Sequence, residues 1–453
     1  GNAMAPMLGQ MSVSGYKFMW WFHMVWVLVF FAVLPQMRIR HLVMAVFSTA
    51  GKPDQPMGEL KPISMEEVEQ TGKIGVETYS DFSRWHLMSL DACMECGRCT
   101  EVCPANRAGK LLNPKQIVQD IRGAYGTETK ITAAVNPERL WECTTCNACV
   151  EACPVTIRHV DLIVDARRNL VAEGQLSGSA AVMLRQTAST SNAWGAPKGS
   201  HEDWMNGLEI PLARDKGSFD VLFWVGCAGS TDPGAIKTTK AVAALLSKAG
   251  VDFACLGNEE ACTGDPARRV GEEFLFQEKA IENVGTFGRY TFKRIVTACP
   301  HCFNTLKHEY SQFEGNYEVV HHSELLDELV REGKLKSAQT QMSNVVFHDP
   351  CYLGRVNKVV DAPRSLVRPD REPPNHGVKT QCCGAGGGRM WMEEEPDQRP
   401  GNVRAQELLD TGAKTVALGC PFCKIMLDAS IKQVTDEEIR LVDLAEMLQE
   451  ANT

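Results

Sequence analysis

The sequence predicts a multidomain protein: the C-terminal end of an α-helical membrane domain, a small helical domain organised by cysteines, and a duplicated α/β domain. Three observations predict this order. An uncharged apolar segment lies near the N-terminus, two identical four-cysteine runs follow it, and a set of cysteines then recurs at a nearly constant offset. At 453 residues the chain is long enough for several domains, each with its own core.

Composition and spacing give the expected boundaries and compartment. We expect the last membrane helix in 1–48, a linker in 49–85, the cysteine-organised helical domain in 86–170, a linker of low order in 171–215, and the two α/β copies in 216–340 and 341–453. The net charge of -9 argues against a nucleic-acid partner, because phosphates require a basic surface. The 18 cysteines cluster at C-x-x-C spacings, which favour metal ligation in a reducing cytoplasm over a disulfide framework.

The apolar segment predicts a membrane span. Residues 18–34 carry no charge, and apolar residues resume at Ile39 and Leu42, which together approach the roughly 20 residues that a bilayer requires. A signal peptide is the competing interpretation, but no small-residue cleavage site follows, and Arg38 and Arg40 come after the apolar run. By the positive-inside rule these arginines predict that all the cysteines face the cytoplasm.

Two histidines in this segment are candidate haem ligands. His23 and His41 are 18 residues apart, which in one continuous helix is five turns and about 27 Å. They would then share a face and suit one axial ligand for each of two b-type haems, with the second ligands on other helices. The alternative is that His41 belongs to an interfacial basic edge. Because the chain starts at Gly1 and not at Met, we expect earlier helices of a longer polypeptide to supply the missing ligands.

The two cysteine runs predict electron transfer. Each reads C-x-x-C-x-x-C-x-x-x-C-P, the pattern of bacterial ferredoxins with two [4Fe-4S] clusters, in which the fourth cysteine of each run ligates the other cluster. One predicted ligand set is Cys93, Cys96, Cys99 and Cys153, and the other is Cys143, Cys146, Cys149 and Cys103. Zinc is the alternative metal for C-x-x-C pairs. Ile117, Val118 and Ile121 at helical spacing predict a helical ferredoxin domain.

The second half of the chain repeats itself. Cys262, Cys299 and Cys302 recur 121 residues later as Cys383, Cys420 and Cys423, and Cys227 recurs 124 residues later as Cys351. Strand-like runs precede the cysteines at 221–225, 295–297, 345–347 and 415–418, and helical patterns such as 241–247 and 403–409 lie between. This alternation predicts a mostly parallel sheet in each copy, with cysteines at the strand ends where ligand sites form.

The copies differ in one ligand. The second offers five thiols, from Cys351, Cys382, Cys383, Cys420 and Cys423. In the first, Ala261 stands where Cys382 would be, which leaves Cys227, Cys262, Cys299 and Cys302 for a [4Fe-4S] cluster, a zinc ion or a purely structural role. Cys255 is left over and is expected to be a buried apolar residue. Gly384 and Gly386 allow the backbone to approach a cluster closely, and His348, Arg355 and Arg389 are candidates for supporting or docking roles.

The second copy resembles the cysteine-rich CCG domain of heterodisulfide reductases and of related subunits of glycolate, glycerol-3-phosphate and lactate oxidoreductases. The resemblance rests on the pattern from Cys351 through Cys382-Cys383-Gly384 to Cys420-Pro-Phe-Cys423. It implies that the five cysteines bind a catalytic non-cubane [4Fe-4S] cluster.

The order of parts is similar to that of membrane-bound iron-sulfur oxidoreductases with a nitrate-reductase gamma-like cytochrome b domain. The stretches 260–269, 301–306 and 347–355 resemble that group. The resemblance implies an electron-transfer flavoprotein:menaquinone oxidoreductase in the inner membrane, whose electrons pass from the flavoprotein through iron-sulfur clusters and b haems to menaquinone. The alternatives are disulfide reduction at the CCG cluster, as in heterodisulfide reductase, and an electron-transfer subunit of a lactate, glycolate or glycerol-3-phosphate dehydrogenase.

Overall fold

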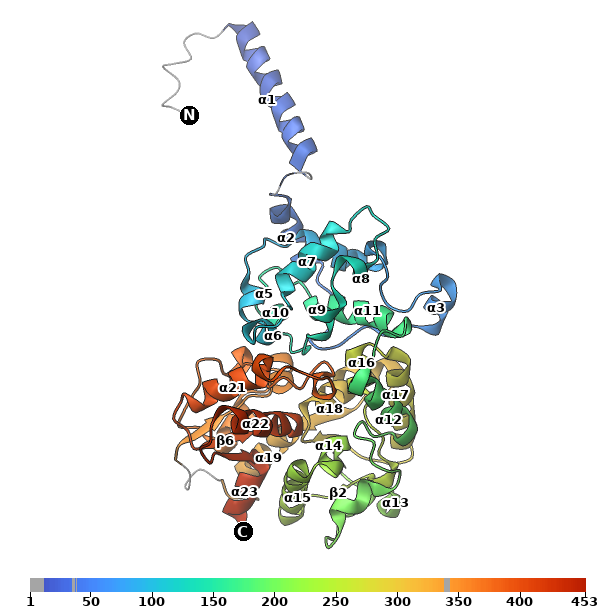
Figure 1. Cartoon of the computed structure of the whole chain (residues 1–453), viewed down its shortest axis with the longest axis vertical. Helices are drawn as coiled ribbons and strands as arrows, with labels where there is room; N and C mark the ends of the chain where they lie inside the picture. Colours follow the sequence, from blue (N-terminus) through green and yellow to red (C-terminus); the bar gives the residue numbers. More distant parts are fainter. Residues whose placement is uncertain (1–11, 35–36, 38, 338–342) are drawn as a thin grey trace.

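The computed structural model describes residues 12–34, 37, 39–337 and 343–453. One long helix projects from the rest of the molecule, a helical domain follows it, and two α/β copies lie side by side at the far end (Figure 1). The fold class predicted from the sequence is confirmed, with an apolar N-terminal helix, a helical cysteine-rich domain and two parallel sheets.

The projecting helix α1 spans Val13–Val33 and none of its side chains is buried. It is long and apolar enough to cross a membrane. The prediction of one continuous helix through His41 is wrong, because α1 ends at Val33 and α2 spans Arg40–Ala50. The sequence between them contains Pro35, which cannot donate a helical hydrogen bond and clashes with the carbonyl four residues earlier. Gly1 and Arg38, used in the sequence argument, lie outside the described residues.

Helix α2 packs on the helical domain. Arg40 forms an ion pair with Asp91 at 2.8 Å, and Trp85 Nε1 donates to the Ser48 carbonyl at 3.0 Å. Met44 and Ala45 pack against the core of that domain. The apolar residues after Ile39 therefore do not simply extend the span.

The helical domain is built from short helices between the cysteines. They are α3 (Met65–Thr71), α4 (Arg84–Asp91), α5 (Arg98–Glu101), α6 (Pro104–Arg107), α7 (Pro114–Gly123), α8 (Ile131–Ala134), α9 (Pro137–Trp141), α10 (Ala148–Glu151) and α11 (His159–Ala172). The predicted helix around Ile117 is confirmed as α7, which Asn113 caps and Pro114 begins. Its residues Ile117, Val118 and Ile121 are buried in the domain core.

The segments expected as linkers are packed. In 49–85, the carbonyls of Gln55, Pro56 and Glu59 accept hydrogen bonds from Arg158, so this stretch is bound to the helical domain. In 171–215, α12 (Gly178–Thr190) buries Met183 and η4 (Ser200–Met205) buries Trp204. The expected low order is therefore wrong for this second segment, because its apolar residues belong to the cores of the α/β copies.

The first copy holds a four-stranded parallel sheet in the order β2-β1-β3-β4. Its strands are β1 (Val221–Trp224), β2 (Phe253–Ala254), β3 (Arg294–Thr297) and β4 (Glu318–His321). Its helices are α13 (Ala213–Lys216), α14 (Gly226–Thr231), α15 (Pro233–Lys248), α16 (Asp265–Val270), α17 (Glu273–Phe287), α18 (Pro300–Asn304) and α19 (His322–Arg331). Strand β1 is buried along its whole length, as expected of a parallel sheet covered on both faces.

The second copy repeats three of these strands in the order β5-β6-β7. They are β5 (Val345–Phe347), β6 (Thr415–Leu418) and β7 (Arg440–Asp443). The helical elements are η8 (Tyr352–Val356), α20 (Asp361–Val367), α21 (Pro400–Leu409), α22 (Pro421–Val434) and α23 (Leu444–Asn452). At the position of β2 there is only a single bridge between Val346 and Arg371. In both copies the cysteines follow the strand ends, as predicted.

Candidate iron-sulfur sites

The outer set, Cys93, Cys96, Cys99 and Cys153, lies around one cavity. These four residues line one small cavity, and Gln119 Nε2 donates to the Cys93 sulfur at 3.3 Å. Cys96 is exposed and Cys93 and Cys153 are half-buried, whereas Cys99 is buried. The fold thus brings the fourth cysteine of the second run to the first three of the first run, as the crossed ligation pattern requires.

The inner set, Cys103, Cys143, Cys146 and Cys149, lines a second small cavity. All four residues are buried. Burial raises the pKa of Cys143 to about 11, as it does that of Cys99 in the outer set. Buried thiols of this kind ionise only beside a compensating positive charge, which cluster iron supplies. Both sets therefore fit a cubane by the number and kind of their donor atoms.

The two sets are neighbours. Cys99 of the outer set and Cys149 of the inner set pack in one small core with Leu60, Val160 and Val164. On its other side the outer set adjoins α4, whose Asp91 pairs with Arg40 of α2. The outer set is therefore linked to α2 through α4, and cysteines of both sets share with Met44 and Ala45 of α2 the core of the helical domain.

The five-cysteine site, Cys351, Cys382, Cys383, Cys420 and Cys423, forms a continuous group of buried thiols. Cys351 contacts Cys382, Cys382 contacts Cys383, and the sulfurs of Cys383 and Cys423 are 3.2 Å apart. Cys423 N lies 3.5 Å from the Cys420 sulfur at the start of α22. Five soft sulfur donors exceed the four that a single metal ion usually takes and are suited to an iron-sulfur cluster.

This site adjoins the inner set directly. Cys382 contacts Cys146, and the two pack with Cys351 in a shared core. The hydrogen bond with Cys382, followed by burial, raises the pKa of Cys146 well above its usual range. The second copy and the helical domain therefore meet at their cysteines.

Arginines fix this junction. The buried Arg355 donates to the carbonyl of Cys146 at 2.9 Å and to that of Val378 at 3.0 Å. Arg167 of α11, fully buried, donates to the carbonyls of Cys143 at 2.7 Å and Gly387 at 3.0 Å. Arg355 had been predicted in a supporting or docking role, but Arg167 was missed. The available signal was a charged residue on an otherwise apolar helix face, between Val164, Ala166 and Leu170.

The glycines of the second copy serve different contacts. A Cβ on Gly386 would lie 2.3 Å from the Thr144 carbonyl oxygen, so this glycine allows close packing on the helical domain. A Cβ on Gly384 would face Met426 at 3.4 Å, and its backbone N donates to the Cys382 sulfur at 3.3 Å. Arg389, the remaining arginine candidate, pairs with Glu394 at 2.7 Å.

The four-cysteine site of the first copy is also assembled. Cys227 contacts Cys262, and Cys299 contacts Cys302. All four residues share a core with Cys420 and Cys423 of the second copy. Cys255 lies apart, in the opposite core between the sheets and α15, as expected for an apolar role. Four buried sulfurs suit either a cluster or a zinc ion.

The candidate haem ligands are separated. His23 is on the exposed surface of α1, and His41 is half-buried on α2. They therefore lie on different helices, and the argument from a shared helix face does not apply to them.

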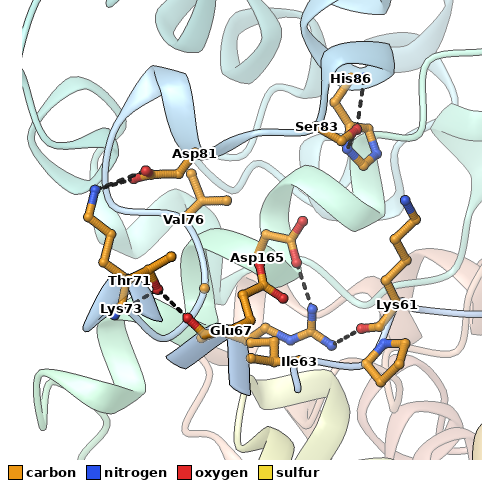
Figure 2. Close-up of a pocket in the computed structure, with 13 residues that line it drawn as sticks. Lys61, Ile63, Glu67, Thr71, Lys73, Val76, Asp81, Ser83, His86 and Asp165 are labelled. Atoms are coloured by element: carbon orange, nitrogen blue, oxygen red, sulfur yellow. Dashed lines mark hydrogen bonds and ion pairs between the residues drawn. The ribbon is translucent and has the colours of Figure 1, made fainter. Parts of the chain in front are cut away.

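A surface cavity of about 400 Å³ lies beside α3 and α11 (Figure 2). Two ion pairs lie in its walls: Lys73 with Asp81 at 2.9 Å, and Arg168 with Asp165 at 2.7 Å. None of the described cysteines lines this cavity. We assign it no redox role.

Two family models match parts of the chain. The family model of the CCG cysteine-rich domain matches residues 221–307 and 345–428, and that of the 4Fe-4S dicluster domain matches residues 83–157.

Three relatives resemble the chain as a whole. It is 35% identical to the EtfAB:quinone oxidoreductase of Syntrophomonas wolfei, over 100% of this chain and 71% of the relative. It is 34% identical to the probable iron-sulfur-binding oxidoreductase FadF of Bacillus subtilis, over 95% of this chain and 69% of that protein. It is 38% identical to a probable membrane-anchored ferredoxin of Chromohalobacter salexigens, over 86% of this chain and 64% of that protein.

Proposed function

Because the chain belongs to the family of iron-sulfur oxidoreductases that includes the EtfAB:quinone oxidoreductase of Syntrophomonas wolfei, we propose that it relays electrons from reduced electron-transfer flavoprotein to menaquinone. The observation that carries this proposal is the unbroken series of cysteine contacts. It runs from the five-cysteine site through Cys382 and Cys146 to the inner set, and through Cys149 and Cys99 to the outer set.

The proposed clusters supply one-electron transfer without proton chemistry. The protein's own residues hold the carriers close together and keep water away. Arg167 and Arg355 fix the junction between the inner set and the second copy through buried hydrogen bonds to carbonyls. Such anchoring limits the rearrangement that must accompany each transfer.

We assign the membrane side to α1 and the outer set. The outer set adjoins α2 through the Arg40–Asp91 pair, and α2 follows the apolar α1 in the chain. This arrangement supports an inner-membrane location with the clusters on the cytoplasmic side. His23 and His41 are our proposed ligands of b-type haems, to be completed by histidines of other helices. Replacement of either histidine by Ala should remove haem from the membranes. The haem content is measured as the pyridine haemochrome.

The test is stopped-flow absorbance of the full-length protein in membranes mixed with reduced electron-transfer flavoprotein. Rapid reduction of the cluster and haem b bands, followed by reoxidation on addition of a menaquinone analogue, is expected. A heterodisulfide is supplied in a parallel run. No response to the flavoprotein together with turnover of the disulfide would overturn the relay and move catalysis to the five-cysteine site. If the clusters are reduced only by a co-purifying lactate, glycolate or glycerol-3-phosphate dehydrogenase, the chain is instead favoured as the electron-transfer subunit of that dehydrogenase.

A further inference from the structure

A buried histidine faces the five-cysteine site. His348 follows the last residue of β5 and is fully buried. One of its ring nitrogens and the sulfurs of Cys383 and Cys423 lie within 4.8 Å of one another. Nδ1 is 3.0 Å from Nε of Arg404, whereas Nε2 has no hydrogen-bond partner among the described residues.

The contact with Arg404 determines where the imidazole carries its hydrogen. A guanidinium group can only donate, so Nδ1 of His348 must accept and carry a lone pair. A neutral imidazole that accepts at Nδ1 carries its proton on Nε2. The other ring nitrogen, Nε2, therefore offers a hydrogen and not a metal-binding lone pair. Three ligand-type side chains so close together would otherwise suggest a His-Cys-Cys metal site.

Arg404 is itself held in place. It is fully buried, and its Nη1 donates to Glu407 at 2.7 Å and to the Asn375 carbonyl at 2.9 Å. The imidazole is thus fixed from behind by a buried network. A buried N–H group without an acceptor is destabilising, so this position favours an acceptor in front of the ring. Thiolate and sulfide sulfurs of a cluster are acceptors of this kind.

The first copy repeats the arrangement with a different residue. Trp224 ends β1 and precedes Cys227 by three residues, as His348 precedes Cys351 by three. It is fully buried, and its Nε1 has no partner in the described part of the chain. Nε1 of Trp224 and the sulfur of Cys302 lie 3.7 and 3.5 Å from the place that a Cβ on Gly226 would take. Indole nitrogen can only donate, so each copy carries a buried N–H without a described acceptor three residues before its first cysteine.

We propose that Nε2–H of His348 donates a hydrogen bond to a sulfur of the group bound at the five-cysteine site. His348 is then a positioning residue that raises the reduction potential of the carrier beside the inner set, because donors to cluster sulfurs stabilise the reduced, more negative state. The inference rests on the proposed cluster at this site.

The test combines redox titration followed by EPR with pulsed ENDOR on the full-length protein in membranes. His348→Leu should move the midpoint potential of the five-cysteine cluster to a more negative value and remove an exchangeable proton coupling. His348→Gln, which retains an N–H, should shift the potential less. Phe347→Leu, a neighbouring buried change in the other core, is the matched control and should leave both readouts unchanged.

Wild-type protein labelled with 15N-histidine makes the test independent of whether His348→Leu assembles its cluster. A weak nitrogen coupling together with an exchangeable proton is expected. A strong coupling, typical of a nitrogen bonded to iron, would overturn the donor role, and so would the absence of any histidine coupling. An unchanged potential in His348→Leu would also overturn it. If the wild-type site yields no cluster signal, the proposed function itself fails at this site, which separates that failure from failure of the histidine inference.

Discussion

The two CCG copies share a framework but differ at the position that meets the helical domain. In the second copy, Cys382 contacts both Cys351 of its own site and Cys146 of the inner set. In the first copy the corresponding residue is Ala261. The cysteine that distinguishes the complete motif is therefore also the one that joins the second copy to the ferredoxin cysteines. Cys382 thus serves both as the fifth ligand of the site and as the connection to the relay.

The segment after the motif differs in the same way. In the second copy Gly386 and Gly387 pack against the backbone of Cys143 and Thr144. In the first copy the equivalent positions are Asp265 and Pro266, which begin α16. Asp265 pairs with Arg269 at 2.9 Å and with His301 at 3.0 Å inside the α/β domain, while the Arg269 carbonyl accepts from Arg167 of the helical domain at 2.7 Å. In the second copy, two glycines that pack closely on the helical domain therefore stand where the first copy begins a helix.

The change Cys382→Ala makes the second copy resemble the first and should have the largest effect. Even changes around a metal ligand cost about 10- to 100-fold in metal affinity, so loss of a thiolate should cost more. We expect loss of the five-cysteine EPR signal and slow reduction of the cubanes by the flavoprotein. Cys255→Ala is the matched control, because Cys255 is equally buried but lies outside both sites. Normal cubane reduction in Cys382→Ala would separate the fifth ligand from the relay.

The change Arg167→Leu tests the junction itself. It removes a buried donor to five carbonyls, those of Leu140, Trp141, Cys143, Arg269 and Gly387. Unsatisfied buried acceptors should lower the free energy of unfolding by about 3–4 kcal/mol. The measurement is thermal loss of cluster absorbance. The exposed Arg185 on α12 provides the control Arg185→Leu, expected to change stability by less than about 0.5 kcal/mol. Equal melting of the two variants would contradict a role for Arg167 at the junction.

The change Gly387→Ala should weaken the same junction from the other side. A Cβ there would lie 2.2 Å from the Cys143 carbonyl oxygen, and the residue has φ +67°. Gly412→Ala is the control, since Gly412 has φ +76° but nothing within 4 Å of its Cβ position. The control should cost about 1–2 kcal/mol from its backbone conformation alone. Gly387→Ala should cost about 1–3 kcal/mol more from overpacking, so equal costs in denaturation would show that the close approach is unimportant.

The change Ala261→Cys restores the full motif in the first copy and should have the smallest effect on stability. Ala261 is buried beside Cys262, so the new thiol joins the existing four. If the first copy lacks a cluster only for want of this ligand, iron content should rise by about four atoms per chain. Metal analysis and EPR of the variant provide the measurement. Unchanged iron with retained zinc would show that the whole first site, and not one residue, selects its metal.

Much of the fold could be predicted from the sequence because its signals are local. The strands at 221–225 and 415–418 are apolar runs, and the crossed ferredoxin pairing follows from cysteine spacing. Pro35 also indicates the break between α1 and α2, but the apolar composition on both sides of it favours one continuous helix. The contact between Cys146 and Cys382 was not readable, because it joins residues 236 positions apart and depends on how two domains pack. The role of Arg404 was hidden for the same reason, since its partners lie on other segments.

Rapid freeze-quench EPR of the full-length protein in membranes, mixed with reduced electron-transfer flavoprotein, tests the central claim most directly. The account predicts that the five-cysteine signal is reduced first and the two cubane signals follow, with the cubanes delayed in Cys382→Ala but not in Cys255→Ala. Reduction of the cubanes before the five-cysteine cluster, at a rate that Cys382→Ala leaves unchanged, would contradict it.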